Sequence, residues 1–362
     1  MLSVEPEWVH LFKMNPYELD RETKHLLLVH ACAHLHKHHY HACDAYRRIV
    51  NCLFTHQDKW LSLEDFPFIP VRMFKEFDLV SVDMNAIVKT MTSSGTSGQQ
   101  VSKIFLDRET SLRQSKVLTQ IVNTFIGHKR LPMLVLDTRD VMKQSRMFSA
   151  RAAGIRGFQI FGRELEFALD EHMNFDYERV LEFLNRHSED QILIFGFTSI
   201  IWMHVVQALI EGNRRLPLDR GILFHGGGWK KMLDQSVDSS TFNRTLGQYT
   251  GLTAIHNYYG MVEQTGSIFV ECSSGYLHAS NYSEILIRDV LDFSVVPFGQ
   301  RGLIQLISVL PYSYPGFSLL TEDLGCILGE DDCPCGRKGR YFQVFGRIPK
   351  AEVRGCSDTY SA

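Results

Sequence analysis

The sequence contains no apolar run of the roughly 18 residues that a membrane-spanning helix requires, so no transmembrane segment is predicted. It also lacks a strong excess of charge, because 38 basic and 41 acidic residues leave a formal net charge of −3. That balance gives no electrostatic basis for binding nucleic acid or an anionic membrane. Residues 1–7 are acidic and have no apolar centre, so no signal peptide is expected.

Cysteine is scarce as well, with eight residues in a chain of 362. This number is too small for a disulfide scaffold, and the clustering of several cysteines indicates thiol or metal chemistry in a reducing compartment. We therefore expect a cytoplasmic protein. The hydrophobic content of 44% and the charged content of 22% are ordinary for a globular chain of one large or two moderate domains.

The first part of the chain is predicted to be helical, because apolar residues between positions 15 and 60 recur at three- and four-residue spacings. Residues 63–77 contain Pro67 and Pro70 and are expected to form extended connecting chain. After residue 98, short apolar strands alternate with helices, which predicts βαβ units and a largely parallel sheet. The expected strands are 131–137, 191–196 and 221–225, and the expected helices are 145–154, 199–212 and one after 225.

Beyond residue 254 the pattern becomes rich in strands and predicts a smaller β subdomain. The expected strands are 254–259, 267–271, 285–289, 303–308 and 325–328.

Residues 92–98, Thr-Ser-Ser-Gly-Thr-Ser-Gly, combine two glycines with five hydroxyl side chains. Such a loop can wrap an anion with backbone N–H groups and hydroxyls. It is not a Walker loop, because no lysine directly follows the second glycine. Taken alone, the run is more typical of a mobile surface linker.

Further segments downstream fit a nucleotide site, although each alone also fits an ordinary turn or strand end. Tyr259-Gly260 offers an aromatic ring before a turn, and Glu263 offers a carboxylate that can hold Mg²⁺. An apolar strand runs into the glycines 226–228, which let a ligand approach the backbone. Asp323 can accept ribose hydroxyls, and Arg347 after Gly346 can meet a phosphate or ribose oxygen.

In this order the segments resemble the adenylate-forming superfamily of acyl-CoA synthetases and adenylation domains. Within it, the chain looks most like the LuxE-type acyl-protein synthetases over nearly its whole length, with phenylacetate-CoA ligases the next closest. The segments that carry this closer resemblance are 16–19 (Pro-Tyr-Glu-Leu), 62–65 through 74–75, 93–98, and 354–357 (Arg-Gly-Cys-Ser).

The resemblance implies the fold, an α/β adenylate-forming large domain with mixed, largely parallel sheets and a smaller β subdomain. It also implies roles for individual residues. The ATP phosphates would be held by Ser94, Gly95, Thr96, Ser97 and Gly98, the adenine side by Gly227, Gly228, Tyr259 and Gly260, the ribose by Asp323, and the ribose or α-phosphate by Arg347. Glu263 would hold Mg²⁺, and Phe197 with Thr198 would contact the carboxylate of the substrate.

Two departures from the superfamily pattern stand out. Fewer than 20 residues follow Gly346, so the mobile C-terminal lid that usually donates a catalytic lysine is expected to be absent. The phosphate loop is followed by residues 99–102 before Lys103, not by Pro-Lys. Another cation must therefore serve, and Lys230 and Lys231 beside the glycine turn are candidates, with Lys231 assigned the catalytic role.

Cys356 lies near the end of the sequence, two residues after Arg354. The ten residues from Gly346 can span up to about 33 Å when extended, which gives a thiolate ample reach to an acyl-adenylate. In the resembled family such a cysteine accepts the acyl group as a thioester, so Cys356 is the expected nucleophile. An ordinary terminal cysteine is the alternative.

Three other cysteines and a histidine predict a structural zinc site. Cys333 and Cys335 form a C-x-C turn, while Cys272 and His278 lie six residues apart. Three thiolates and one imidazole suit tetrahedral Zn²⁺. Cys326 is a possible substitute ligand, and unlinked reduced thiols are the alternative.

These inferences predict four regions: an N-terminal helical region 1–80, an ATP-binding α/β core 81–254, a β-rich subdomain 255–345 with the zinc site, and a tail 346–362. The expected function is activation of a carboxylic acid, long-chain fatty acid favoured, with ATP and Mg²⁺. The acyl group then passes to Cys356 and on to an acyl-accepting protein partner, a reductase or transferase. The alternatives are an acyl- or aryl-CoA ligase and a non-catalytic adenylate-binding protein.

Overall fold

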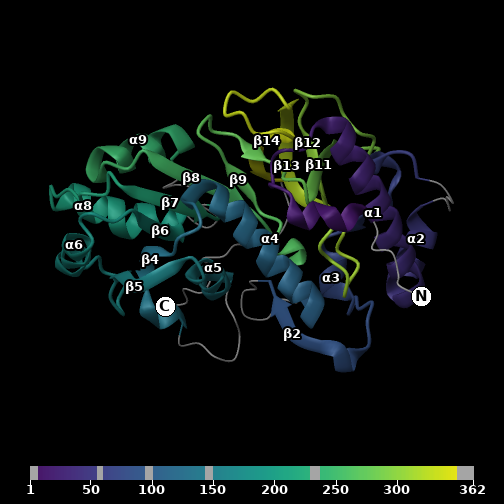
Figure 1. Cartoon of the computed structure of the whole chain (residues 1–362), viewed down its shortest axis with the longest axis horizontal. Helices are drawn as coiled ribbons and strands as arrows, with labels where there is room; N and C mark the ends of the chain where they lie inside the picture. The colour runs from purple at the N-terminus through teal and green to yellow at the C-terminus, as the bar shows by residue number, and fades with distance from the viewer. Residues whose placement is uncertain (1–6, 55–59, 94–100, 143–149, 229–236, 349–362) are drawn as a thin grey trace. The chain divides into compact units, whose positions relative to one another are not determined.

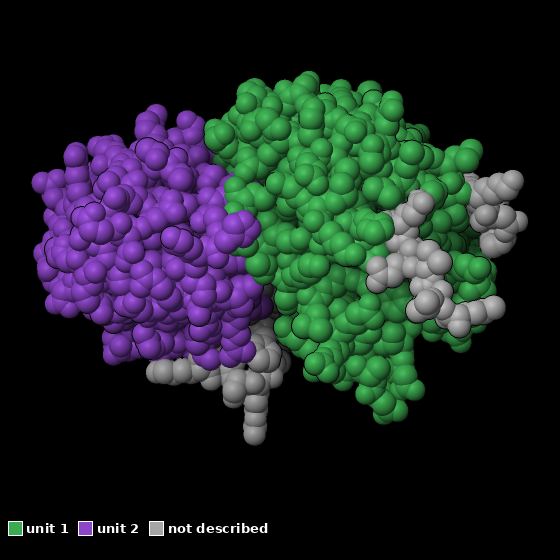
Figure 2. All heavy atoms as spheres, in the orientation of Figure 1, with its two compact units in different colours: residues 1–91, 100–124, 260–351 green, residues 92–99, 125–259, 352–362 purple. Residues whose placement is uncertain are grey.

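The computed structural model describes residues 7–54, 60–93, 101–142, 150–228 and 237–348 (Figure 1). The chain forms two compact units, which are coloured separately in Figure 2. Unit 1 comprises residues 1–91, 100–124 and 260–351, and unit 2 comprises residues 92–99, 125–259 and 352–362. The four-region division expected from the sequence stays a prediction.

Unit 2 is built on a parallel sheet. Its strands are β4 (Leu131–Thr138), β5 (Gly162–Leu169), β6 (Ile192–Phe197), β7 (Gly221–Gly226) and β8 (Ala254–Tyr259), in the order β8-β7-β6-β4-β5. Each neighbouring pair is parallel. Every residue of β6 is buried, as expected for a parallel strand that is covered on both faces. The βαβ units predicted from the sequence are confirmed.

Helices connect these strands. They are α5 (Ala150–Gln159), α6 (Tyr177–Arg186), a continuous helix made of α7 (Thr198–Ile200), a π-helical segment (Ile201–Val206) and α8 (Gln207–Glu211), and α9 (Ser239–Thr250). Asp238 caps α9 by accepting a hydrogen bond from the backbone N–H of Thr241, and Gly251 ends it in the left-handed conformation, with φ of +72°.

The two faces of this sheet carry different helices. The Phe158 ring of α5 packs against Phe195 and Phe224, with centroids 4.4 and 5.3 Å apart. On the opposite face, a Cβ placed on Gly196 would lie 3.0 Å from the Ile201 side chain. The aromatic side chains of β6 and β7 therefore gather under α5.

Unit 1 contains an antiparallel sheet. Its strands are β9 (Phe269–Glu271), β10 (Leu277–His278), β11 (Ser283–Arg288), β12 (Gly302–Ser308), β13 (Ser318–Glu330) and β14 (Arg340–Arg347), in the order β11-β12-β13-β14-β10-β9. The short β1 (Ile69–Pro70) runs parallel to the first residues of β13. The strands β2 (Ile87–Thr92) and β3 (Lys103–Asp107) pair separately. The predicted strand-rich region after residue 254 is confirmed.

Helices and short 3₁₀ turns complete unit 1. They are η1 (Glu7–Lys13), α1 (Arg21–Ala42), α2 (Asp44–Leu53), η2 (Leu63–Asp65), α3 (Met73–Glu76), η3 (Met84–Ala86), η7 (Val262–Gln264) and all but the last two residues of α4 (Arg108–Ile126). Asp20 caps α1 by accepting from the backbone N–H of Thr23 at 3.0 Å. Figure 1 shows α1 alongside β11, where Lys24 and Glu284 form a buried ion pair of 3.0 Å.

Some predicted elements need correction. Of the helix expected over 145–154, residues 145–149 lie outside the described residues. The described helix α5 ends at Gln159, later than expected, and its Phe158 packs on the sheet beyond the expected end. Within 63–77, expected as extended chain, residues 73–76 form the one-turn helix α3, whose Phe74 is buried. The strand expected at 325–328 is part of the 13-residue β13. None of the described helices combines the length and the apolar character needed to cross a membrane.

Candidate functional site

Glu263 is a buried carboxylate in the turn η7, which follows the predicted Tyr259-Gly260 segment. Only 5% of Glu263 is exposed. Burial raises the pKa of Glu263, against the opposing effects of a hydrogen bond from Ser102 and the positive charge of Arg347. The turn is fixed from both sides, because Tyr314 Oη donates to the Glu263 carbonyl at 2.9 Å and Gln264 Nε2 donates to the Gly316 carbonyl at 2.8 Å.

Asp323 and Arg347 occupy paired positions on β13 and β14. Arg347 Nε lies 3.5 Å from Asp323 Oδ1, and the two side chains are 36% and 16% exposed. Gly346, just before the arginine, has a φ of +98°, which a residue with a side chain rarely adopts. The charge of Arg347 acts on both Asp323 and Glu263, so unit 1 brings three of the sequence-predicted residues together.

Among the described residues, several predicted site residues lie in unit 2 at the carboxyl ends of parallel strands. β7 ends at Gly226, and Gly227 follows with a φ of +82°. β8 ends at Tyr259, and β6 ends at Phe197 with Thr198 next in the chain. In open α/β sheets, ligands bind at this edge of the strands. Gly228, the last described residue of this turn, is exposed.

Thr198 and His225 form a buried hydrogen-bonded pair within unit 2. Thr198 Oγ1 lies 2.9 Å from His225 Nδ1 and 3.2 Å from the Gly226 carbonyl. Burial lowers the pKa of His225 to about 3, so the imidazole is neutral near pH 7. A neutral imidazole can donate a hydrogen bond to the hydroxyl or accept one from it, and either bond places no charge beside the hydroxyl. This pair fixes the Thr198 hydroxyl at the end of β6.

Sequence reasoning assigned no role to Ser102 or His225. The position of His225 directly before the glycine turn is a signal that could have found it. Ser102 has no such motif, and only folding brings it to Glu263. Several predicted residues lie outside the described part of the chain: Ser94, Gly95, Thr96, Ser97, Gly98, Lys230, Lys231 and Cys356.

The predicted zinc ligands lie together in unit 1. One ligand atom from each of Cys272, His278, Cys333 and Cys335 falls within 4.8 Å of all the others. The Cys272 and Cys333 sulfurs are 3.9 Å apart, and Cys335 Sγ is 3.4 Å from His278 Nε2. Zn–S bonds of about 2.3 Å and Zn–N bonds of about 2.0 Å place tetrahedral ligands roughly 3.8 and 3.5 Å apart, so the set fits Zn²⁺.

Strand pairing assembles this cluster. Cys272 directly follows β9, His278 ends β10, and both other cysteines lie in the turn between β13 and β14. His278 pairs with Tyr341 of β14, which brings the two hairpins side by side. Burial opposes ionisation of the Cys272 thiol, but hydrogen bonds, the largest from His278, leave its pKa below the ordinary value. Cys326 is outside the cluster, and its thiol points to the Ile327 carbonyl at 3.5 Å.

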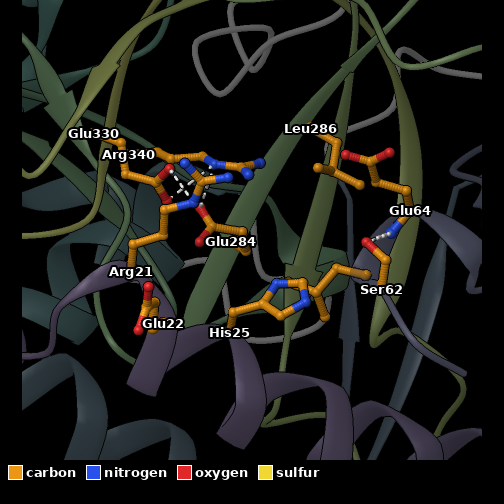
Figure 3. Close-up of a pocket in the computed structure, with 10 residues that line it drawn as sticks. Arg21, Glu22, His25, Ser62, Glu64, Glu284, Leu286, Glu330 and Arg340 are labelled. Carbon is orange, nitrogen blue, oxygen red and sulfur yellow. Dashed lines mark hydrogen bonds and ion pairs between the residues drawn. The ribbon is translucent and has the colours of Figure 1, made fainter.

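A charged pocket of about 300 Å³ lies at the beginning of α1 (Figure 3). Glu330 is within 3.4 Å of Arg21 and 3.3 Å of Arg340, and Figure 3 shows these three side chains clustered on one wall. Ser62 and Glu64 lie on the other side of the cavity. These ion pairs attach the first turn of α1 to β13 and β14. Sequence analysis did not predict them.

Comparisons with known proteins agree with this arrangement. Residues 5–362 match the model of the family described as acyl-protein synthetase, LuxE. A long-chain-fatty-acid–luciferin-component ligase from Vibrio harveyi is 25% identical over 341 residues, covering 89% of this chain and 84% of the relative. The Aliivibrio fischeri protein of the same name is 24% identical over 328 residues, and the match covers 88% of this chain and 84% of the Aliivibrio fischeri protein.

Among solved structures, the chain is similar to 2-hydroxyisobutyryl-CoA ligase in the postadenylation state with 2-HIB-AMP. The TM-score is 0.68 at 16% identity, with 92% of this chain and 70% of that chain covered. This similarity confirms the predicted adenylate-forming fold. The chain belongs to the LuxE family of acyl-protein synthetases.

Proposed function

We propose that this chain uses ATP to activate a long-chain fatty acid as an acyl-adenylate and then holds the acyl group as a thioester on Cys356. A carboxylate oxygen of the acid attacks the α-phosphorus of ATP, and pyrophosphate leaves. The Cys356 thiolate then attacks the acyl carbonyl carbon, and AMP leaves. The fatty acid comes from the names of the two bacterial relatives.

One observation carries the proposal: Glu263 is buried within the electrostatic reach of Arg347, which itself pairs with Asp323. Burying a carboxylate is costly even with the hydrogen bond from Ser102, and a role in binding a cation accounts for it. Mg²⁺ supplies charge neutralisation for the phosphates when bound, and Glu263 is the side chain that would hold it. Asp323 would accept the ribose hydroxyls, and Arg347 would donate to the ribose or α-phosphate.

The remaining roles follow the expectations from sequence. Residues 94–98 would donate N–H groups and hydroxyls to the ATP phosphates, and Lys231 would supply a further cation. Gly227, Gly228, Tyr259 and Gly260 would enclose the adenine. The Thr198 hydroxyl would accept a hydrogen bond from His225 Nδ1–H and would donate its one proton to the acid carboxylate beside Phe197, in place of the Gly226 carbonyl. Hydrogen-bond donors that are already in position favour the reaction, because they need not reorganise when negative charge develops in the transition state.

We also propose that the cluster of three cysteines and His278 binds one structural Zn²⁺. The four side chains would supply all four ligands of a tetrahedral ion, which would leave no open position for catalysis. The acyl acceptor is proposed to be a protein partner such as a reductase or transferase.

The proposal is tested by labelling with radioactive fatty acid and Mg-ATP. Wild type, Cys356→Ala and Cys52→Ala are compared, because Cys52 is an exposed thiol without an assigned role. The expected result is label that survives denaturation, is released by hydroxylamine, and is absent only from Cys356→Ala. Adenylation without retained label, followed by transfer to added CoA, would instead identify an acyl-CoA ligase. ATP binding without pyrophosphate exchange for any acid would identify a non-catalytic protein.

A further inference from the structure

Tyr314 lies in the connection between β12 and β13 and is fully buried. Its phenol makes two hydrogen bonds. Tyr314 Oη donates to the backbone carbonyl of Glu263 at 2.9 Å and accepts from Gln114 Nε2 of α4 at 3.3 Å. A hydroxyl that accepts one hydrogen bond is a stronger donor in the next. Gln114 therefore strengthens the bond from Tyr314 to the turn that carries Glu263.

The backbone that carries Tyr314 is held by Ser313. Ser313 Oγ donates to the Phe105 carbonyl of β3 at 2.7 Å, and the Ser313 backbone N–H donates to Thr110 Oγ1 of α4 at 3.2 Å. The Ser313 carbonyl accepts from Ser81 N at 2.8 Å. The position from which the Tyr314 side chain extends is therefore fixed by three other segments of unit 1.

Gly316 allows the Tyr314 ring to reach the turn. A Cβ on Gly316 would overlap Tyr314 Cε2 and would lie 2.8 Å from the Glu263 carbonyl oxygen. A side chain at position 316 would therefore push the phenol away from this carbonyl. Glycine is the residue that permits such a close approach.

The hydrogen bonds of the turn itself lie on either side of Glu263. Gln264 N donates to the Met261 carbonyl at 3.1 Å, and Ser267 N donates to the Gln264 carbonyl at 3.4 Å. The Glu263 carbonyl, by contrast, is held by Tyr314 from outside the turn. The backbone orientation of Glu263, and with it the direction of the carboxylate, therefore depends on Tyr314.

We infer that Tyr314 is a positioning residue for the carboxylate of Glu263. The inference rests on the proposed function, because it takes Glu263 to hold Mg²⁺. Groups that orient a metal ligand without touching the metal change the metal affinity about 10- to 100-fold when they are removed. Without the Tyr314 hydroxyl, the Glu263 carbonyl loses this partner inside the protein, and the turn has a reason to move.

The test is calorimetric measurement of two dissociation constants, one for Mg-ATP and one for AMP in the presence of EDTA. AMP carries the adenine, the ribose and the α-phosphate but requires no metal. Wild type is compared with Tyr314→Phe, which keeps the ring and removes the hydroxyl. We expect Tyr314→Phe to raise the Kd for Mg-ATP about 10-fold or more and to leave the Kd for AMP within about twofold of wild type. In pyrophosphate exchange, the Mg²⁺ concentration for half-maximal rate should rise as well.

The matched control is Tyr282→Phe. Tyr282 is also a fully buried tyrosine of unit 1, and its hydroxyl lies 3.1 Å from the Met14 carbonyl and 3.2 Å from Gln120 Oε1 of α4. Both variants remove one buried hydroxyl, so both should lower the melting temperature. Tyr282→Phe should leave the Kd for Mg-ATP unchanged, because its hydroxyl does not contact the turn of Glu263.

An unchanged Kd for Mg-ATP in folded Tyr314→Phe would overturn the inference, and so would an equal loss of affinity for AMP. Either result would mean that the hydroxyl only stabilises unit 1. If Tyr314→Phe does not fold, Gln114→Leu decides, because it removes the bond that Tyr314 accepts and must weaken Mg-ATP more than AMP. Wild type that binds Mg-ATP but exchanges no pyrophosphate with any acid is a different result, because it contradicts the proposed function and not the role of Tyr314.

Discussion

Asp323 and Arg347 face each other across adjacent strands, with Arg347 Nε 3.5 Å from Asp323 Oδ1. The pair is only partly buried, so its attraction contributes little to stability. Its partly open position instead suits a ligand that both side chains can contact.

Replacing Asp323 by alanine should raise the KM for ATP about 10- to 100-fold, because hydrogen bonds from ribose to a carboxylate are lost. The measurement is pyrophosphate exchange at saturating acid with varied ATP. Asp292→Ala serves as the control, since Asp292 is an exposed aspartate that accepts from Ser294 N. A KM for ATP that is unchanged in Asp323→Ala would remove the ribose role.

Glu263→Gln keeps the size of the side chain but removes its charge. If Glu263 holds Mg²⁺, exchange should fall about 100-fold or more, and the Mg²⁺ concentration for half-maximal rate should rise. Glu166→Gln is the control, because Glu166 is a partly buried glutamate that pairs with Arg179 in unit 2. Exchange at the wild-type rate in Glu263→Gln would contradict the metal role.

Purified protein should contain about one zinc ion per chain by elemental analysis. Cys333→Ser and Cys335→Ser should each lose the ion and lower the melting temperature, because metal binding stabilises only the folded state. Cys326→Ser tests a buried thiol outside the cluster and should retain the metal. Metal-free protein whose melting temperature is insensitive to zinc would refute the site.

Burial lowers the pKa of His225 to about 3, whereas an unfolded histidine has a pKa of about 6.5. The unfolded chain therefore binds a proton that the folded chain does not, as pH falls below about 6.5. The contribution of His225 to the free energy of unfolding should therefore decrease by about 1.4 kcal/mol for each pH unit as the pH falls from about 6.5 to about 3. His225→Gln should remove this share of the pH dependence, as measured by urea unfolding between pH 5 and 7.

His39 is also buried with a lowered pKa, but it is present in both proteins, so the difference isolates His225. The control is His172→Gln, which removes an imidazole that is exposed and not buried. Identical slopes for wild type and His225→Gln would show that His225 binds equally many protons in the folded and unfolded states, and would contradict the lowered pKa.

The buried ion pair of Lys24 and Glu284 is 3.0 Å long, with exposures of 1% and 5%. Lys24→Met leaves Glu284 without its closest cation and should cost about 3–5 kcal/mol of stability. The double variant Lys24→Met with Glu284→Leu should recover most of that loss, because no uncompensated charge remains. Chemical unfolding of the three proteins measures both effects. A single variant as stable as wild type would mean that Arg340, 4.0 Å from Glu284, suffices.

Periodic features of the sequence predicted much of the fold. The continuous apolar runs of β4, β6 and β7 identified a parallel sheet, since few other elements have that pattern. β14 was not predicted, because only one of its residues is fully buried and its composition is mixed. It pairs with β13 as the second strand of a hairpin, but residues 331–339 between them form a connection too long to give the signal of a tight turn.

In the candidate site, too, spacing within the sequence predicted some of the contacts but not those between distant residues. The spacing of Cys272, His278, Cys333 and Cys335 predicted a cluster that the fold does bring together. The contacts of Ser102 and Tyr314 with Glu263 were missed, because each joins residues far apart in the sequence. A single serine or tyrosine carries no spacing signal of its own.

Unit 1 draws most of its helices from the first 91 residues and its antiparallel sheet from residues 260–351. During synthesis, α1, whose Leu28 and Leu35 are buried in the folded chain, is therefore made long before β11, with which it forms the Lys24–Glu284 ion pair. All of unit 2 up to residue 259 emerges in between and can fold as a continuous βαβ segment. A nascent chain released before residue 260 would expose the helices of unit 1 without the antiparallel sheet and should depend on chaperones. Truncation before residue 260 should therefore prevent unit 1 from folding, although it removes only the last part of the chain.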